Sequence, residues 1–292
     1  MITTGPLGPG DLDAVLAVWV ACEEHDDGAA EVSRDDLVAM IGRPSFDFAR
    51  DSFGLCEDGA LVAFGVQIGT RLTFAFVHPA ARGRGLGTWL LGWAEAAARE
   101  VGARACTQSL SEPDAGARAL LAAHGYEPRW EDWFFALDLA AEPAPPALPP
   151  GYAIRPLGAG DERAAYDVID RAFSEWPDRD GSSFDDWSAS TLGRPGFEPS
   201  LLTLAVRGDE VAGALLLVVE EDEGWVDQLA VALEHRGRGL ARALLQHAFG
   251  ETWRRGLRRT GLSTDSRTGA RGLYEHVGMH VRKTYTEFAK PL

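Results

Sequence analysis

The stretch Arg82-Gly83-Arg84-Gly85-Leu86-Gly87 returns later in the chain as Arg236-Gly237-Arg238-Gly239-Leu240-Ala241. Two other patterns recur in the same order around it. Pro-Leu-Gly occurs at 6–8 and at 156–158, and A-x-x-L-[LY]-x-x-x-G-[YM] occurs at 117–126 and at 270–279. Three matches in register indicate that one unit has been duplicated within the chain.

The duplication predicts the domain organisation. A chain of 292 residues is long enough for two domains of roughly 150 residues each. Residues 140–150 read AAEPAPPALPP, and a segment so rich in proline can neither continue a helix nor pair inside a sheet. We therefore predict an N-terminal domain at 1–140, a proline-rich linker at 141–150 and a C-terminal domain at 151–292.

In both halves the glycine-rich stretch stands between a predicted strand, at 72–77 or 225–231, and a long amphipathic helix. Glycine lacks the Cβ atom that would hold a phosphate away from the backbone, and a helix N-terminus offers free N–H groups. The stretch is therefore predicted to cradle an anion. No Gly-Lys-Ser/Thr follows it, and its glycine spacing differs from that of a dinucleotide-binding loop.

The order of strand, R-x-x-G-x-G/A and helix resembles motif A of the GNAT superfamily of N-acetyltransferases. The resemblance covers both halves and implies an α/β fold of two tandem GNAT domains, each with a mixed, mostly antiparallel central sheet flanked by helices. It implies acetyl-CoA as cosubstrate, with its pyrophosphate on the motif and its pantetheine arm along the edge of the preceding strand.

The cofactor contacts that this resemblance implies form two sets, one in each half. They are Val77, Arg82, Gly83, Arg84, Gly85, Leu86, Gly87 and Thr88 in the first half, and Val231, Arg236, Gly237, Arg238, Gly239, Leu240, Ala241 and Ser266 in the second. Ser266 departs from the family pattern, because many relatives have Asn in that region. Ordinary core packing is the alternative for the two valines, and both roles can hold at once.

Two residues of the second half are candidates for proton transfer. Tyr274 falls at the Tyr position of the family's L-Y-x-x-x-G-F ending, which implies that its phenol protonates the departing sulfur of coenzyme A. Attack on the thioester needs a neutral amine, so a carboxylate or a water chain must remove a proton. Asp227 is the candidate base, because strand alternation predicts that it shares a face with Trp225, Leu229 and Val231. A half-buried structural tyrosine and a solvated or salt-bridged aspartate are the alternatives.

The first half differs at both of these places. Thr73 occupies the position of Asp227, and Leu121 occupies the position of Tyr274. An apolar leucine cannot donate a proton, so the N-terminal domain is predicted to be catalytically degenerate and the C-terminal domain to be catalytic. Whether the N-terminal domain binds acetyl-CoA stays open.

The amino-acid composition restricts the classes of binding partner that the protein is expected to have. The formal net charge of -16 disfavours nucleic acid and anionic membranes and favours a cationic substrate, although a charge spread for solubility is the alternative. No apolar run approaches the roughly 20 residues of a membrane span. The three cysteines show no C-x-x-C spacing and the histidines no metal-ligand spacing. We expect a cytoplasmic monomer or homodimer without a metal.

Together these observations predict an acetyl-CoA-dependent N-acetyltransferase. Its C-terminal domain would transfer an acetyl group to the primary amine of a small, cationic molecule by direct attack of the amine on the thioester. Two alternatives stay open at this point. One is a non-catalytic acyl-CoA-binding or regulatory protein, against which Tyr274 argues, and the other is a protein acetyltransferase that modifies Lys or an N-terminal amine.

Overall fold

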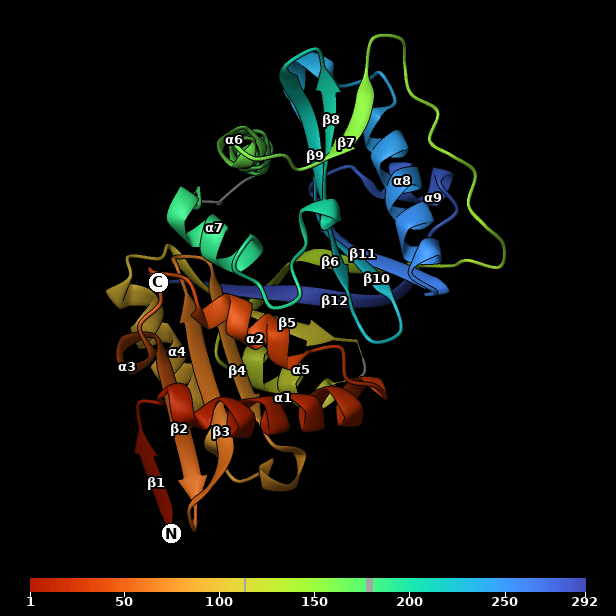
Figure 1. Cartoon of the computed structure of the whole chain (residues 1–292). Helices are drawn as coiled ribbons and strands as arrows, with labels where there is room; N and C mark the ends of the chain where they lie inside the picture. The colour runs from red at the N-terminus through yellow and green to blue at the C-terminus, as the bar shows by residue number, and fades with distance from the viewer. Residues whose placement is uncertain (113, 177–180) are drawn as a thin grey trace. The chain divides into compact units, whose positions relative to one another are not determined.

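The computed structural model describes residues 1–112, 114–176 and 181–292 (Figure 1). The first repeat contains β1 (Ile2–Gly5), η1 (Pro9–Asp11), α1 (Leu12–Asp27), α2 (Arg34–Ile41), α3 (Phe48–Asp51), β2 (Ser52–Glu57), β3 (Ala60–Ile68), β4 (Leu72–Val77), η2 (Pro79–Ala81), α4 (Leu86–Glu100), β5 (Ala105–Ser111), α5 (Ala115–Ala123) and β6 (Glu127–Asp138).

The second repeat follows the same order, apart from short helices. It contains β7 (Ala153–Pro156), α6 (Glu162–Phe173), α7 (Phe184–Thr191), η3 (Pro199–Leu201), β8 (Leu202–Arg207), β9 (Glu210–Val219), β10 (Gly224–Val231), η4 (Leu233–His235), α8 (Leu240–Arg254), β11 (Arg259–Asp265), α9 (Arg271–His276) and β12 (His280–Pro291). The predicted duplication is thus visible element by element. Among the described residues, no helix is both long enough and apolar enough to span a bilayer.

The chain forms two compact units, and neither is continuous in sequence. Unit 1 consists of residues 1–131, 188–195 and 285–292, and unit 2 consists of residues 132–187 and 196–284. Residues 132–140, which the sequence analysis assigned to the N-terminal domain, therefore pack in unit 2. The reason is strand pairing, because the last strand of each repeat ends in the unit built mainly by the other repeat.

The strand registers define this exchange. In unit 2, residues 132–138 of β6 pair antiparallel with β11, and in unit 1, residues 285–291 of β12 pair antiparallel with β5. Sequence alternation specifies a strand and its buried face but does not name its neighbour. The exchange therefore could not be predicted from the hydrophobic pattern of β6 and β12.

Within each unit the remaining strands form antiparallel hairpins. Unit 1 has the order β1-β2-β3-β4, and unit 2 has β7-β8-β9-β10 followed by a parallel step from β10 to β11. In Figure 1, α6 and α8 lie on opposite sides of the β8–β9 pair. The helix α8 buries Leu240, Leu244 and Leu245 in the core of unit 2 together with Phe135 of β6. The mixed, helix-flanked sheet that the sequence predicts is confirmed.

Candidate active site

In unit 2 the parallel strands β10 and β11 pair over only part of the length of β10 and then separate. This strand pairs with β9 from Gly224 to Val231, but with β11 only at residues 224–226. Beyond that point β11 continues along β6 instead. In the part of the chain that the structure describes, the ladder between β10 and β11 therefore ends at Val226, and the two strands separate beyond it. The resemblance implied such a splayed edge at Val231.

A β-bulge lies where the two strands separate. The β9–β10 register shifts between Val226 and Gln228, so Asp227 is the extra residue. A bulge interrupts the alternation of side chains, and the predicted common face of Asp227 with Trp225 and Leu229 is therefore not maintained through this point. Asp227 is exposed, and its Oδ2 accepts a hydrogen bond of 3.2 Å from Gln228. The carboxylate is thus accessible to solvent at the mouth of the split.

The cradle glycines adopt backbone conformations that other residues rarely take. Gly237 and Gly239 have φ values of 70° and 85°, and Gly83 and Gly85 have φ values of 75° and 82°. A Cβ atom added at any of the four would meet no atom within 4 Å. Because α4 and α8 begin directly after Gly85 and Gly239, their first N–H groups lack partners within the helix. Both turns fit an anion such as a pyrophosphate.

The first arginine of each motif holds the turn in place. Nε of Arg236 donates to the carbonyl oxygen of Val231 at 2.9 Å, and its two terminal nitrogens donate to Glu175 at 2.7 and 2.9 Å. Arg82 repeats this arrangement with Val77 at 3.1 Å and Asp26 at 2.6 and 2.7 Å. The sequence predicts both arginines as cofactor contacts, but their guanidinium groups are occupied by carboxylates. They position the cradle.

The second arginine distinguishes the two cradles. Arg84 forms a bidentate pair with Glu57, at 2.9 and 2.5 Å, and this pair lowers the pKa of Glu57. In the second repeat, Arg207 stands where Glu57 stands in the first. Arg238 donates only to a backbone carbonyl, that of Glu234 at 3.3 Å, among the described residues. Its positive charge is therefore available to an anion.

A further charge adds to this difference. Arg242, in the first turn of α8, occupies the position of Thr88 in α4. It is exposed and has no ion pair with any residue that the structure describes. Sequence reasoning missed Arg242 because it lies outside the motif. The C-terminal cradle thus has two accessible arginines, Arg238 and Arg242, whereas both arginines of the N-terminal motif are paired with carboxylates.

The remaining predicted cradle residues described next lie in the first turns of α4 and α8 and pack against neighbouring elements. Leu86 and Leu240 point into the cores and are buried. A Cβ atom added at Gly87 would lie 2.9 Å from Leu120, whereas Ala241 carries one at the matching place. These residues keep the helix close to its neighbours rather than reaching the anion with side chains.

Tyr274 lies in α9, buried in the core of unit 2. Its ring packs on Phe135 with the centroids 5.3 Å apart. Burial raises its pKa to about 12, and a hydrogen bond with the Thr264 side chain partly opposes this rise. The phenol therefore stays protonated at neutral pH, as a proton donor must.

A short chain of hydroxyl groups continues from Tyr274. The Oγ1 atoms of Thr264 and Thr268 lie 2.9 Å apart. Thr264 belongs to the part of β11 that no longer pairs with β10, so the hydroxyl groups lie along the split. The predicted contact Ser266 lies in the exposed turn between these threonines. Sequence reasoning singled out Ser266 for the cofactor but missed Thr264.

The first repeat lacks the whole hydroxyl arrangement. Leu121 is 3% exposed and packs in an apolar cluster of unit 1. Leu110, at the place that Thr264 takes in the equal-length strand β11, packs against the same cluster. Thr73 is buried and donates to Gln67 at 2.7 Å. No group at these three positions of unit 1 is both accessible and able to exchange a proton.

The geometry of unit 2, a glycine turn at a helix N-terminus beside a split strand pair, is that of a class of protein whose site fits an anionic group. The acetyltransferase (GNAT) family model matches residues 16–126 and 163–279. A mycothiol acetyltransferase of Kineococcus radiotolerans is 34% identical over 252 residues, covering 82% of this chain and 80% of that protein. A mycothiol acetyltransferase of Thermobispora bispora is 32% identical over 288 residues, covering 92% of each.

A solved structure agrees with these relatives. The crystal structure of a GCN5-related N-acetyltransferase from Sphaerobacter thermophilus is similar with a TM-score of 0.78 and 31% identity, covering 99% of this chain and 95% of that chain. The chain belongs to the acetyltransferase (GNAT) family and is an N-acetyltransferase with two tandem GNAT domains. The predicted family, fold and enzyme class are confirmed.

Proposed function

We propose that unit 2 transfers an acetyl group from acetyl-CoA to the primary amine of a small molecule, and that the acceptor is the amine from which mycothiol is made. The observation that carries the catalytic part is the pairing of an accessible cradle, at Gly237, Arg238 and Gly239, with a buried, protonated phenol at Tyr274. The two relatives named as mycothiol acetyltransferases support the choice of acceptor.

Acetyl-CoA fits the residues of unit 2. The backbone amides at the start of α8 would hold its pyrophosphate, with Arg238 and Arg242 neutralising charge. The stretch of β10 beyond Val226, which forms no ladder with β11 among the described residues, would pair with the amide groups of its arm. When bound, acetyl-CoA supplies an activated acetyl group as a thioester.

Asp227 and Tyr274, which lie at the split between β10 and β11, then carry out the proton transfers. Asp227, or a water molecule beside it, removes a proton from the incoming ammonium group, so that the nitrogen lone pair is free to form the new C–N bond. Tyr274 would give its proton to the sulfur as the C–S bond breaks, and the second proton lost by the nitrogen would pass to solvent while the phenol regains a proton through the hydroxyl groups of Thr264 and Thr268. The protein has a formal net charge of -16. The resulting negative electrostatic potential attracts a cationic acceptor.

The test is an assay of acetyl-CoA against a panel containing the amine precursor of mycothiol, other small amines and peptides. Because that acceptor itself has a thiol, acetylated product should be followed by mass spectrometry rather than free thiol by a colour reaction. We expect the precursor to give the highest kcat/KM. A preference for peptides would instead support a protein acetyltransferase, and preference for another small amine would refute the acceptor assignment alone.

A matched pair of glycine variants tests the cofactor site. Gly239→Ala and Gly85→Ala introduce the same Cβ at φ values of 85° and 82°, in equally open surroundings. Each substitution costs about 1–2 kcal/mol of backbone strain. The two variants should therefore lose the same amount of stability. Only Gly239→Ala should abolish turnover, and equal loss of turnover in both variants would contradict the assignment to unit 2.

A further inference from the structure

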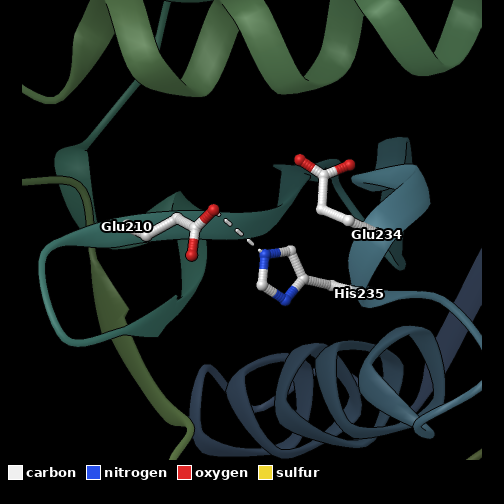
Figure 2. Close-up of side chains that lie close together, drawn as sticks. All are labelled: Glu210, Glu234 and His235. Atoms are coloured by element: carbon white, nitrogen blue, oxygen red, sulfur yellow. Dashed lines mark ion pairs between the residues drawn. The ribbon is translucent and has the colours of Figure 1, made fainter.

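A cluster of metal-ligand side chains lies directly before the C-terminal cradle. One atom each from Glu210, Glu234 and His235 lies within 4.8 Å of the others. Figure 2 shows the carboxylate of Glu210, from the β8–β9 hairpin, turned towards the imidazole of His235 in η4, with Glu234 beside it. Sequence spacing missed the cluster because the hairpin brings Glu210 in from a different part of the chain.

The histidine is held as a metal ligand would be. His235 is 4% exposed, and its Nε2 makes no hydrogen bond with the described residues, although Oε1 of Glu210 lies 3.2 Å away. Its other nitrogen, Nδ1, lies 2.8 Å from the hydroxyl of Tyr152, whose ring meets the imidazole edge-on. Metal-binding histidines usually donate the second ring N–H to such a partner, which fixes the tautomer and the ring orientation.

The other repeat shows that the fold does not need these side chains. The matching positions of the first repeat are Ala60, Ala80 and Ala81. Ala81 is buried at 3% exposure, as His235 is at 4%. A small apolar residue therefore suffices for packing at this place, and the second repeat has a buried imidazole and two carboxylates instead.

We propose that Glu210, Glu234 and His235 bind a first-row divalent metal ion of the zinc class, completed by water. Imidazole nitrogen and carboxylate oxygen are ligands that zinc accepts, at about 2.0–2.2 Å, whereas magnesium and calcium prefer oxygen alone. Ligand atoms around zinc lie roughly 3.3 Å apart in a tetrahedron, so the carboxylates must close on the ion. Both glutamates are exposed and free to rotate towards it, while the imidazole stays fixed.

The metal would brace the approach to the cradle. It would join the β8–β9 hairpin to η4, whose Glu234 carbonyl accepts a hydrogen bond from Arg238. Glu210, Glu234 and His235 take no part in the acetyl-transfer steps. Metal binding at these residues can therefore be measured without knowing the acceptor and without turnover.

Zinc binding to the full-length, chelator-treated protein tests the proposal by isothermal titration, with Co²⁺ absorption reporting the ligand field. We expect one zinc ion per chain in this site and at least a tenfold weaker affinity in both Glu210→Gln and Glu234→Gln, which change exposed side chains. Glu221→Gln, an exposed acid of the β9–β10 turn, should bind zinc as the wild type does. Failure to bind zinc at millimolar free ion, or equal affinity in all three variants, would overturn the proposal.

Tyr152→Phe separates coordination from simple attraction of the ion to two carboxylates. Loss of the partner of Nδ1 should weaken zinc binding about 10–100-fold, as for other outer partners of metal-bound histidines, and should alter the Co²⁺ spectrum. Unchanged zinc affinity and an unchanged Co²⁺ spectrum in folded Tyr152→Phe would show that His235 is not a ligand.

Discussion

Replacing Tyr274 with Phe removes one hydroxyl group and leaves the ring that packs on Phe135. A positioned general acid contributes about 10²–10⁴-fold to the rate. At about 1.36 kcal/mol per tenfold, the barrier rises by about 3–5 kcal/mol. No cavity forms, because the ring and its packing on Phe135 are kept, so we expect little change in the free energy of unfolding. We therefore expect a large fall in kcat with almost unchanged affinity for acetyl-CoA.

The measurement combines the rate of acetylated product with the binding constant of acetyl-CoA and the free energy of unfolding. Tyr126→Phe is the control, because it also removes a buried tyrosine hydroxyl, from unit 1 at 3% exposure. The reasoning would be refuted if Tyr274→Phe kept kcat within a factor of a few, or if Tyr126→Phe reduced kcat equally. In the wild type, the raised pKa of about 12 predicts no loss of activity from ionisation of Tyr274 below that pH.

Three other predictions concern the contrast between the repeats. Arg238→Ala should weaken acetyl-CoA binding at the catalytic site about 10–100-fold, the value of one or two charge-assisted hydrogen bonds, whereas Arg84→Ala removes a pair with Glu57 and should leave kcat/KM unchanged. Asp227→Asn should lower kcat/KM, because the amide cannot take a proton from the amine; an unchanged kcat/KM would exclude Asp227 as the base. Leu121→Ala, at 3% exposure, should destabilise unit 1 by about 2–5 kcal/mol in chemical denaturation, with kcat per folded molecule unaltered.

Much of the fold follows from local sequence. The glycine turns are predictable because only glycine takes left-handed φ without strain, and Gly83, Gly85, Gly237 and Gly239 all do so. The capping box of Ser33 and Asp36 forms at the start of α2 as local pairing requires. Such features depend on residues within a few positions of one another, and their outcome does not depend on the tertiary context.

The remaining features depend on contacts that sequence spacing does not encode. The bulge at Asp227 arises from the register with β9, so counting alternate residues along β10 gave a face that is not maintained. The clamps from Glu175 to Arg236 and from Asp26 to Arg82 join different elements. The motif alone does not show that the side chain of its first arginine pairs with a carboxylate of another element.

The duplication allows support and chemistry to be separated within one molecule. What both repeats keep is what shapes the turn, namely the left-handed glycines and an arginine that joins the strand end to a carboxylate. What they do not share is charge and proton supply, because Arg238 is accessible where Arg84 is paired, and Tyr274 has a hydroxyl where Leu121 has none. Residues needed for folding constrain both copies, whereas residues needed for turnover constrain only the copy that reacts. These differences support the proposal that unit 2 is the site of acetyl transfer.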